Sequence, residues 1–187
     1  MAGRAALAAG LCSALVGCGD AAPDDPVACT DAGVIVADPT AWRVVTDDAD
    51  DPWGPAVNRC PATQHRTEVQ ADARWHEVET RGCGTATVLQ PARTALCAGD
   101  TIAIDVWHFP ITEGDGDWQI AIGVIDDDGF QEVMSDAVPL PGAATTFSIR
   151  VPVGRAVERG DTIALRIRNH GTNTWNLYPL TTADAPD

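Results

Sequence analysis

The segment Asp100–His108 has the sequence DTIAIDVWH, in which aliphatic residues alternate with other residues. Successive side chains of a β-strand point to opposite faces of the sheet. The two isoleucines and Val106 therefore share one face, and Asp105 and Trp107 share the other. This alternation is typical of a strand that is buried on one face only. We expect the aliphatic side chains in a core and Trp107 on an outer surface.

The same alternation recurs through the second half of the chain. It returns in residues 118–125, 147–151, 163–167 and 175–177, with Gly, Pro or Asp between the segments. Trp118 and Trp175 have the parity of the aliphatic residues in their segments, so we expect both in the core. No segment shows a sustained helical period. Short half-buried strands separated by turns at this spacing predict an all-β fold with a single antiparallel β-sandwich.

Two of these strands begin with nearly the same sequence. Residues 99–104 are GDTIAI and residues 160–165 are GDTIAL, so five of six positions match. A Gly-Asp turn that leads directly into a strand explains the match, and two copies are too few for a repeat architecture. Strands that begin in this way loosely resemble those of jelly-roll domains, including carbohydrate-binding modules. The resemblance implies a jelly-roll-like sandwich.

The N-terminus has the features of an export signal. Arg4 precedes an apolar run over residues 5–16, which is too short to span a bilayer of ~30 Å. The sequence LVGC at residues 15–18 resembles the lipobox of bacterial lipoproteins. This resemblance implies that residues 1–17 are a signal peptide that is removed, and that Cys18 then carries a lipid. An ordinary signal peptide with a chance cysteine is the alternative.

A lipidated Cys18 implies an extracytoplasmic protein that is attached to a bacterial membrane. Acyl chains bury CH₂ groups at ~0.8 kcal/mol each, and more than one chain is enough for stable attachment. Some lipoproteins are held at the inner membrane by an Asp directly after the lipidated cysteine. This chain has Gly19 at that position, so we expect the outer membrane or the cell surface.

The charge balance argues against one class of partner. The chain of 187 residues has 27 acidic and 12 basic residues, and all the basic ones are Arg. A formal net charge of −15 repels phosphate backbones. The sequence therefore predicts no nucleic-acid binding.

The composition changes near residue 65. Residues 18–64 are rich in Asp, Ala and Pro, which predicts an acidic and partly disordered linker. Strand-like sequence at residues 34–36 and 42–45 suggests a small disulfide-closed hairpin within this linker. We expect the sandwich at residues 65–182 and a C-terminal tail at residues 183–187.

Four cysteines follow the lipidation position, namely Cys29, Cys60, Cys83 and Cys97. An even number in an exported chain predicts disulfides, with three possible connectivities. We expect the pairs Cys29–Cys60 and Cys83–Cys97, because each closes a local loop and would stabilise the fold by roughly 3–4 kcal/mol. A zinc site would need clustered short spacings, and these are absent.

The aromatic residues suggest a binding surface. Trp107 and Asp105 share the outer face of their strand, and an aromatic ring beside a carboxylate suits a sugar. Arg166 and Arg168 also point outward and could add donors, so we predict a glycan site from these four residues. Two alternatives stay open: a loop covers Trp107, or the domain is a structural or protein-interaction module of the cell envelope.

The remaining candidate sites are weaker. Asp126, Asp127 and Asp128 precede Gly129, and this sequence favours a hairpin turn, with a structural calcium ion as the alternative. His108 shares the parity of the core residues of its strand, so we expect a structural role for it. No catalytic motif is present, because no serine lies in a G-x-S-x-G sequence. We therefore expect binding and no enzymatic activity.

Overall fold

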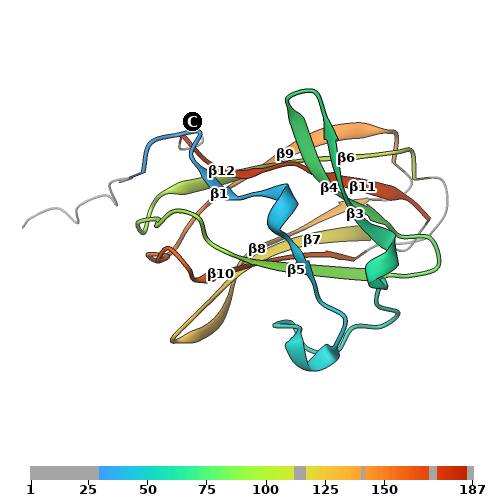
Figure 1. Ribbon diagram of the computed structural model, residues 1–187, viewed down its shortest axis with the longest axis horizontal. Helices are drawn as coiled ribbons and strands as arrows, with labels where there is room; N and C mark the ends of the chain where they lie inside the picture. The colour runs from blue at the N-terminus through green and yellow to red at the C-terminus, as the bar shows by residue number, and fades with distance from the viewer. Residues whose placement is uncertain (1–29, 112–116, 140–141, 169–171, 185–187) are drawn as a thin grey trace, which may run out of the picture.

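The structure, a computed structural model, describes residues 30–111, 117–139, 142–168 and 172–184. These residues form two antiparallel sheets that pack face to face around a hydrophobic core (Figure 1). The predicted all-β sandwich is confirmed.

Sheet A contains seven strands within the described ranges. Its order is β1-β12-β6-β11-β4-β3, and β9 also pairs with β6. The strands are β1 (Ile35–Ala37), β3 (His65–Gln70), β4 (Ala73–Glu79), β6 (Thr101–His108), β9 (Thr145–Pro152), β11 (Thr174–Leu177) and β12 (Leu180–Ala183).

Sheet B has five strands in this part of the chain, in the order β2-β5-β10-β7-β8. They are β2 (Arg43–Val44), β5 (Thr85–Pro91), β7 (Asp117–Asp126), β8 (Gly129–Pro139) and β10 (Thr162–Arg168). Among the described connections there are three short 3₁₀ helices: η1 (Pro39–Ala41), η2 (Asp48–Asp50) and η3 (Ala62–Gln64).

The core lies between the sheets. Ile104 of β6 and Leu165 of β10 are each 1% exposed, as their alternation predicts. Rings fill one part of the core, where Trp118 and Trp175 are fully buried with centroids 4.6 Å apart. His108 lies against Trp175 at 4.9 Å and is 1% exposed. The predicted core positions of both tryptophans and of His108 are confirmed.

The repeated Gly-Asp sequence forms the same turn twice. Gly99 and Gly160 have φ angles of +99° and +108°, a region that favours glycine. The carboxylates of Asp100 and Asp161 each accept a hydrogen bond from the backbone N–H three positions earlier, at 2.9 and 2.8 Å. The turns lead into β6 of sheet A and towards β10 of sheet B, so the sequence match reflects a shared turn geometry.

The predicted linker at residues 18–64 contributes to both sheets. β1 pairs with β12 and β2 pairs with β5, and Val36 and Val45 are fully buried. The two strands join different sheets and not each other, so the predicted hairpin and the boundary after residue 64 are wrong. Asp residues that follow each of these strands form caps, because Asp38 after β1 and Asp47 after β2 accept hydrogen bonds at the starts of η1 and η2.

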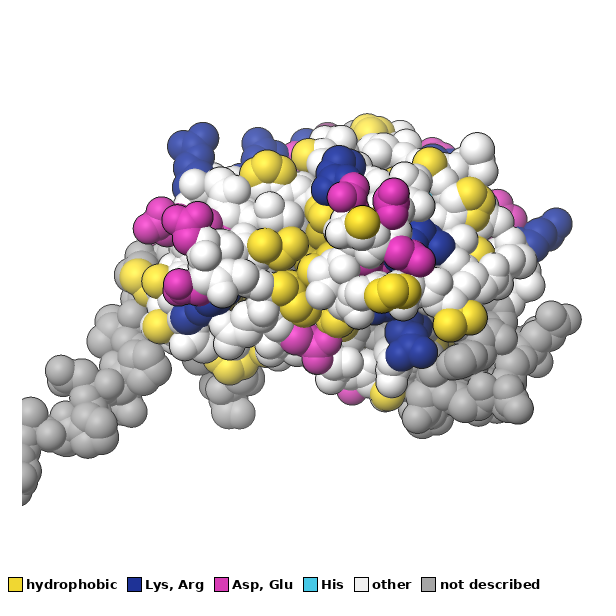
Figure 2. Space-filling view, turned by 90° about the horizontal axis from the view of Figure 1, so that it is seen from below, with side chains coloured by type: hydrophobic (Ala, Val, Ile, Leu, Met, Phe, Trp, Pro, Cys, Tyr) yellow, Lys and Arg dark blue, Asp and Glu magenta, His cyan; other side chains and the backbone are white. Residues whose placement is uncertain are grey.

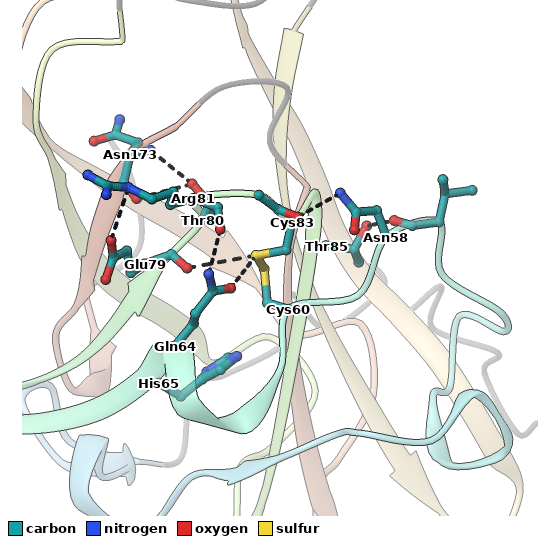
Figure 3. Close-up of a disulfide and its surroundings, with 12 residues drawn as sticks. Asn58, Cys60, Gln64, His65, Glu79, Thr80, Arg81, Cys83, Thr85 and Asn173 are labelled. Carbon is teal, nitrogen blue, oxygen red and sulfur yellow. Dashed lines mark hydrogen bonds and ion pairs between the residues drawn. A yellow bond between two sulfur atoms is a disulfide. The ribbon is translucent and has the colours of Figure 1, made fainter.

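The disulfide connectivity also differs from the prediction. Cys60 is bonded to Cys83, which excludes both expected pairs (Figure 3). Residues 58–60 run beside the start of β5, where the Cys60 N–H donates to the Thr85 carbonyl at 2.7 Å. This pairing brings the two sulfurs together although the cysteines are 23 residues apart. Cys97 is disulfide-bonded as well.

Several predictions concern parts of the chain that the structure does not describe. The signal peptide, Cys18 and Cys29 lie outside the described residues. Within those that are described, no helix is long and apolar enough to cross a membrane.

Candidate functional site

The four residues of the predicted glycan site lie on two different surfaces. Trp107 and Asp105 are on the outer face of sheet A, because β6 turns its aliphatic residues inward. Arg166 and Arg168 are on the outer face of sheet B, because β10 does the same. The core separates the two pairs, so they do not form one site.

The outer face of sheet A carries four aromatic rings, and we call it the aromatic face. Trp107 is half-buried, and its ring lies edge-on to Phe109 at 4.4 Å. Trp75 of β4 and Tyr178, which follows β11, have ring centroids 6.0 Å apart. The Tyr178 N–H donates to the Asp105 carbonyl at 3.1 Å, which places it beside β6.

Polar groups accompany these rings. Asp105 is exposed and accepts a hydrogen bond from the Ser148 hydroxyl on the paired strand β9. Asp105, Ser148 and Arg150 line a hollow of about 330 Å³ that reaches Thr181 and Asp184. The hollow presents a carboxylate, hydroxyls and a guanidinium to solvent, which suits a ligand with several hydroxyl groups.

A second polar group lies on the other side of Trp107. Asn176 pairs with Trp107 on one side and with Glu77 on the other. Glu77 forms an ion pair with Arg66. The Asn176 side-chain oxygen is buried and has no hydrogen-bond partner among the described residues. A buried, unpaired acceptor of this kind is uncommon in a folded protein.

The outer face of sheet B is covered by residues 45–60, which we call the covering segment (Figure 1). Its Val45 and Trp53 pack on Leu89 of β5 and Ala164 of β10. The view from this side shows hydrophobic side chains gathered near the middle of the face (Figure 2). β5 is therefore buried on both faces over most of its length.

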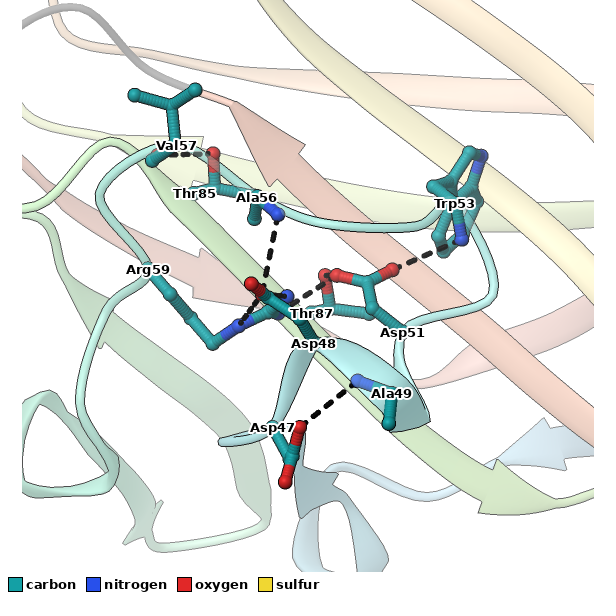
Figure 4. A network of polar contacts seen from close by, with 10 residues as sticks. All are labelled: Asp47, Asp48, Ala49, Asp51, Trp53, Ala56, Val57, Arg59, Thr85 and Thr87. Carbon is teal, nitrogen blue, oxygen red and sulfur yellow. Dashed lines mark hydrogen bonds and ion pairs between the residues drawn. The ribbon is translucent and has the colours of Figure 1, made fainter.

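A buried carboxylate attaches the covering segment to sheet B (Figure 4). The Asp51 side chain is fully buried and accepts hydrogen bonds from Arg59 at 2.7 Å and from the Thr87 hydroxyl at 2.9 Å. Its other oxygen accepts from the Trp53 backbone N–H at 3.0 Å. Arg59 also pairs with Asp48 at 2.6 Å. This network sets the position of Trp53 over the sheet.

The hairpin turn between β7 and β8 contains the three candidate calcium ligands. Asp126 accepts a hydrogen bond from the Asp128 N–H at 2.9 Å and pairs with Arg155 at 2.7 Å. Gly129 has a φ angle of +104°. The turn interpretation is confirmed, and Asp127 belongs to the same turn. Among the described residues, no three metal-ligating side chains come together.

Two histidines form a buried pair at the edge of sheet A. The His65 Nδ1 and the His76 Nε2 are 3.1 Å apart. The pKa of each is lowered to about 4, mainly by burial. At His76 the charge of the neighbouring histidine contributes to this lowering. Both imidazoles are therefore neutral at pH 7. They form a hydrogen bond with each other, and we assign the pair a structural role.

Comparison with known proteins shows the fold. No protein-family profile and no curated protein sequence matches the chain. A family 28 carbohydrate-binding module specific for non-crystalline cellulose has a TM-score of 0.50 and 7% identity, over 64% of this chain and 79% of that one. This likeness shows a shared β-sandwich.

Two further solved structures are similar at lower scores. A family 61 module in complex with β-1,4-galactotriose has a TM-score of 0.43 and 12% identity, over 78% of this chain and 90% of that one. The K3 adhesin domain of Lys-gingipain from Porphyromonas gingivalis has a TM-score of 0.48 and 14% identity, over 82% of this chain and 100% of that one.

Sequence reasoning missed three aromatic residues at these surfaces. Trp75 has the parity of Glu77 and Glu79, so the alternation of its strand could have placed it on the outer face. Tyr178 lies at an interruption between β11 and β12, where alternation gives no guide. Trp53 was assigned to the linker, and no local pattern indicates that this segment covers a sheet.

Proposed function

We propose that the protein binds a neutral glycan on the aromatic face. The observation that carries this proposal is the gathering of Trp107, Trp75 and Tyr178 on one outer sheet face next to Asp105 and Ser148. The aromatic face supports this better than the shared fold does, because one fold serves many functions.

The chemistry of this face matches a sugar chain. Aromatic rings pack against the C–H groups of a sugar ring, while carboxylates and hydroxyls bind its hydroxyl groups. Asp105 puts a negative charge near the rings, whereas the charge of Glu77 is offset by its ion pair with Arg66. Acidic sugars would be repelled there, so the expected ligand is uncharged.

The test is a titration of neutral polysaccharides, including a soluble cellulose derivative, xylan and galactan, against the purified protein. We expect Trp107→Ala to weaken binding at least tenfold, or about 1.4 kcal/mol. Trp53→Ala is the matched control, because it removes a tryptophan from the opposite face. Absence of binding to every neutral glycan, or equal affinity in wild type and Trp107→Ala, would overturn the proposal.

The alternative is a structural or protein-interaction module of the cell envelope. Both the glycan-binding function and this alternative involve binding without catalysis. The aromatic face favours glycan binding. A membrane pulldown that recovers one envelope protein with wild type but not with Trp107→Ala, in the absence of glycan binding, would favour the alternative.

We also propose that Cys18 anchors the protein to a membrane, at the outer membrane or the cell surface. The lipobox-like sequence at residues 15–18 supports this. The test is palmitate labelling in a bacterial host. We expect Cys18→Ala to abolish labelling and release the protein from membranes, and undiminished labelling would contradict the anchor.

A further inference from the structure

A second hollow lies on the outer face of sheet B, beside the covering segment. It has a volume of about 80 Å³ and is lined by Trp53, Gln119, Ala121, Glu132, Ser135, Arg166 and Arg168. We call it the arginine pocket. Its residues come from the covering segment and from strands β7, β8 and β10. They are far apart in the sequence and come together only in the folded chain.

One wall of the arginine pocket is held in place. The Trp53 indole N–H donates to the Glu132 carboxylate at 2.5 Å, and its ring lies edge-on to Phe130 at 4.8 Å. The Trp53 backbone N–H is bound by the buried Asp51. These contacts fix the indole and occupy one oxygen of the acidic residue in the pocket.

The two arginines of the pocket lack acidic partners. Seven other arginines form ion pairs with carboxylates, namely Arg43, Arg59, Arg66, Arg74, Arg81, Arg93 and Arg155. Within the described residues, Arg166 and Arg168 form none, and the same is true of the exposed Arg150 and Arg159. Arg168 donates to the Gln119 side chain at 3.2 Å, and Arg166 lies over the Trp53 ring at 5.9 Å.

Arg166 is the less solvated of the two. Its Nε is buried and has no hydrogen-bond partner among the described residues. Burial lowers the pKa of Arg166, the charge of Asp51 opposes this in part, and the charge of Arg168 adds to the lowering. The side chain still carries its charge at neutral pH. A cation that is partly removed from water without a direct ion-pair partner is unfavourable, and a bound anion would offset this cost.

We propose that the arginine pocket binds an anionic group, a carboxylate or a sulfate, carried on an acidic polysaccharide. Two guanidinium groups with an amide and a hydroxyl match the oxygens of such a group, and arginine binds carboxylates in a planar, bidentate way. The Trp53 ring offers a surface for the sugar that bears it. The small volume accommodates one such group and not a chain.

This inference does not depend on the proposed neutral glycan site, which lies on the other sheet. The formal net charge of −15 also makes non-specific attraction of a polyanion unfavourable. Binding of an acidic polysaccharide would therefore report a local cationic site.

The experiment is a titration of the purified protein with polygalacturonate, dextran sulfate and uncharged dextran. We expect one or both polyanions to bind, and Arg168→Gln to weaken that binding at least tenfold. Arg168 is exposed, so its replacement should leave the fold intact. Arg159→Gln is the matched control, because it removes the same charge at an exposed position away from the pocket.

The outcomes separate the sources of the anion and the two sites. Binding of polygalacturonate alone identifies a carboxylate, and binding of dextran sulfate alone identifies a sulfate. Trp107→Ala should retain polyanion binding. The inference is overturned if neither polyanion binds, if dextran binds equally well, or if Arg168→Gln and Arg159→Gln behave alike.

Discussion

The two outer faces of the sandwich are built from the same kind of strand but present different chemistry. Sheet A leaves its face open, with Trp107, Trp75 and Tyr178 beside acidic side chains. Sheet B buries most of its face under the covering segment and leaves a small pocket with Arg166 and Arg168.

The difference comes from what lies on top of each sheet. In both sheets alternate residues point outward, and some of those on sheet B are apolar, such as Leu89 and Ala164. These apolar side chains favour a cover, and the covering segment supplies it. The open face then suits an uncharged ligand, and the covered face keeps room for one anionic group.

The largest expected effect is on the attachment of the cover. Asp51→Ala leaves Arg59 largely buried and without its buried partner, which should lower the free energy of unfolding by about 3–5 kcal/mol. Asp50→Ala is the control, because Asp50 is exposed and its ion pair with Arg43, at 3.5 Å, contributes little to stability. Urea denaturation measures both, and similar losses for the two variants would contradict the role of the network.

Removing the disulfide tests the end of the cover. Cys60→Ala/Cys83→Ala should lower the free energy of unfolding by about 3 kcal/mol, because the bond closes a loop across a separation of 23 residues. The arginine pocket should lose affinity for its anion more than the aromatic face loses affinity for a glycan, since residues 58–60 are the end of the covering segment. Unchanged stability in denaturant titrations would contradict this prediction.

The histidine pair tests the edge of sheet A. The pKa values of His65 and His76 are about 4 in the folded chain, whereas histidine in an unfolded chain titrates near 6.5. The unfolded state therefore binds more protons between these pH values. Stability from the pair is complete above pH 6.5 and should fall by at least about 2 kcal/mol as the pH drops to 4.

The measurement for this pair is the free energy of unfolding at pH 7, 5.5 and 4. Carboxylates elsewhere titrate in wild type and variant alike, so the comparison with His65→Gln/His76→Gln isolates the histidines. The variant should lose less stability over this interval, and parallel profiles would argue against neutral buried imidazoles.

The smallest effect concerns the twin turns that lead towards the two sheets. Gly99→Ala and Gly160→Ala should each cost about 1 kcal/mol, because both positions have positive φ angles. Gly154→Ala is the control, since an added Cβ meets nothing within 4 Å there and no positive φ is required. Thermal unfolding would show the turns to be different if only one of the two variants lost stability.

Much of the fold could be predicted from local patterns. Alternation placed β6, β7, β9 and β10, and it identified Trp118 and Trp175 as core residues. The disulfide pairing could not be predicted from loop length, which favours the pairs Cys29–Cys60 and Cys83–Cys97. The observed Cys60–Cys83 contact depends on residues 58–60 lying beside β5. The four residues of the predicted glycan site could not be assigned to one surface from the sequence, since parity gives the face of a strand but not the sheet to which it belongs.

The sequence by itself determined the strands, their inward faces and the two Gly-Asp turns, because period-two alternation and glycine backbone angles are local properties. Only the tertiary structure decided that β1 and β2 belong to different sheets, that Trp53 lies over sheet B, and that Arg166 and Trp107 are on opposite sides of the core. These features arise from contacts between residues far apart in the chain, and such contacts leave no periodic signal in the sequence.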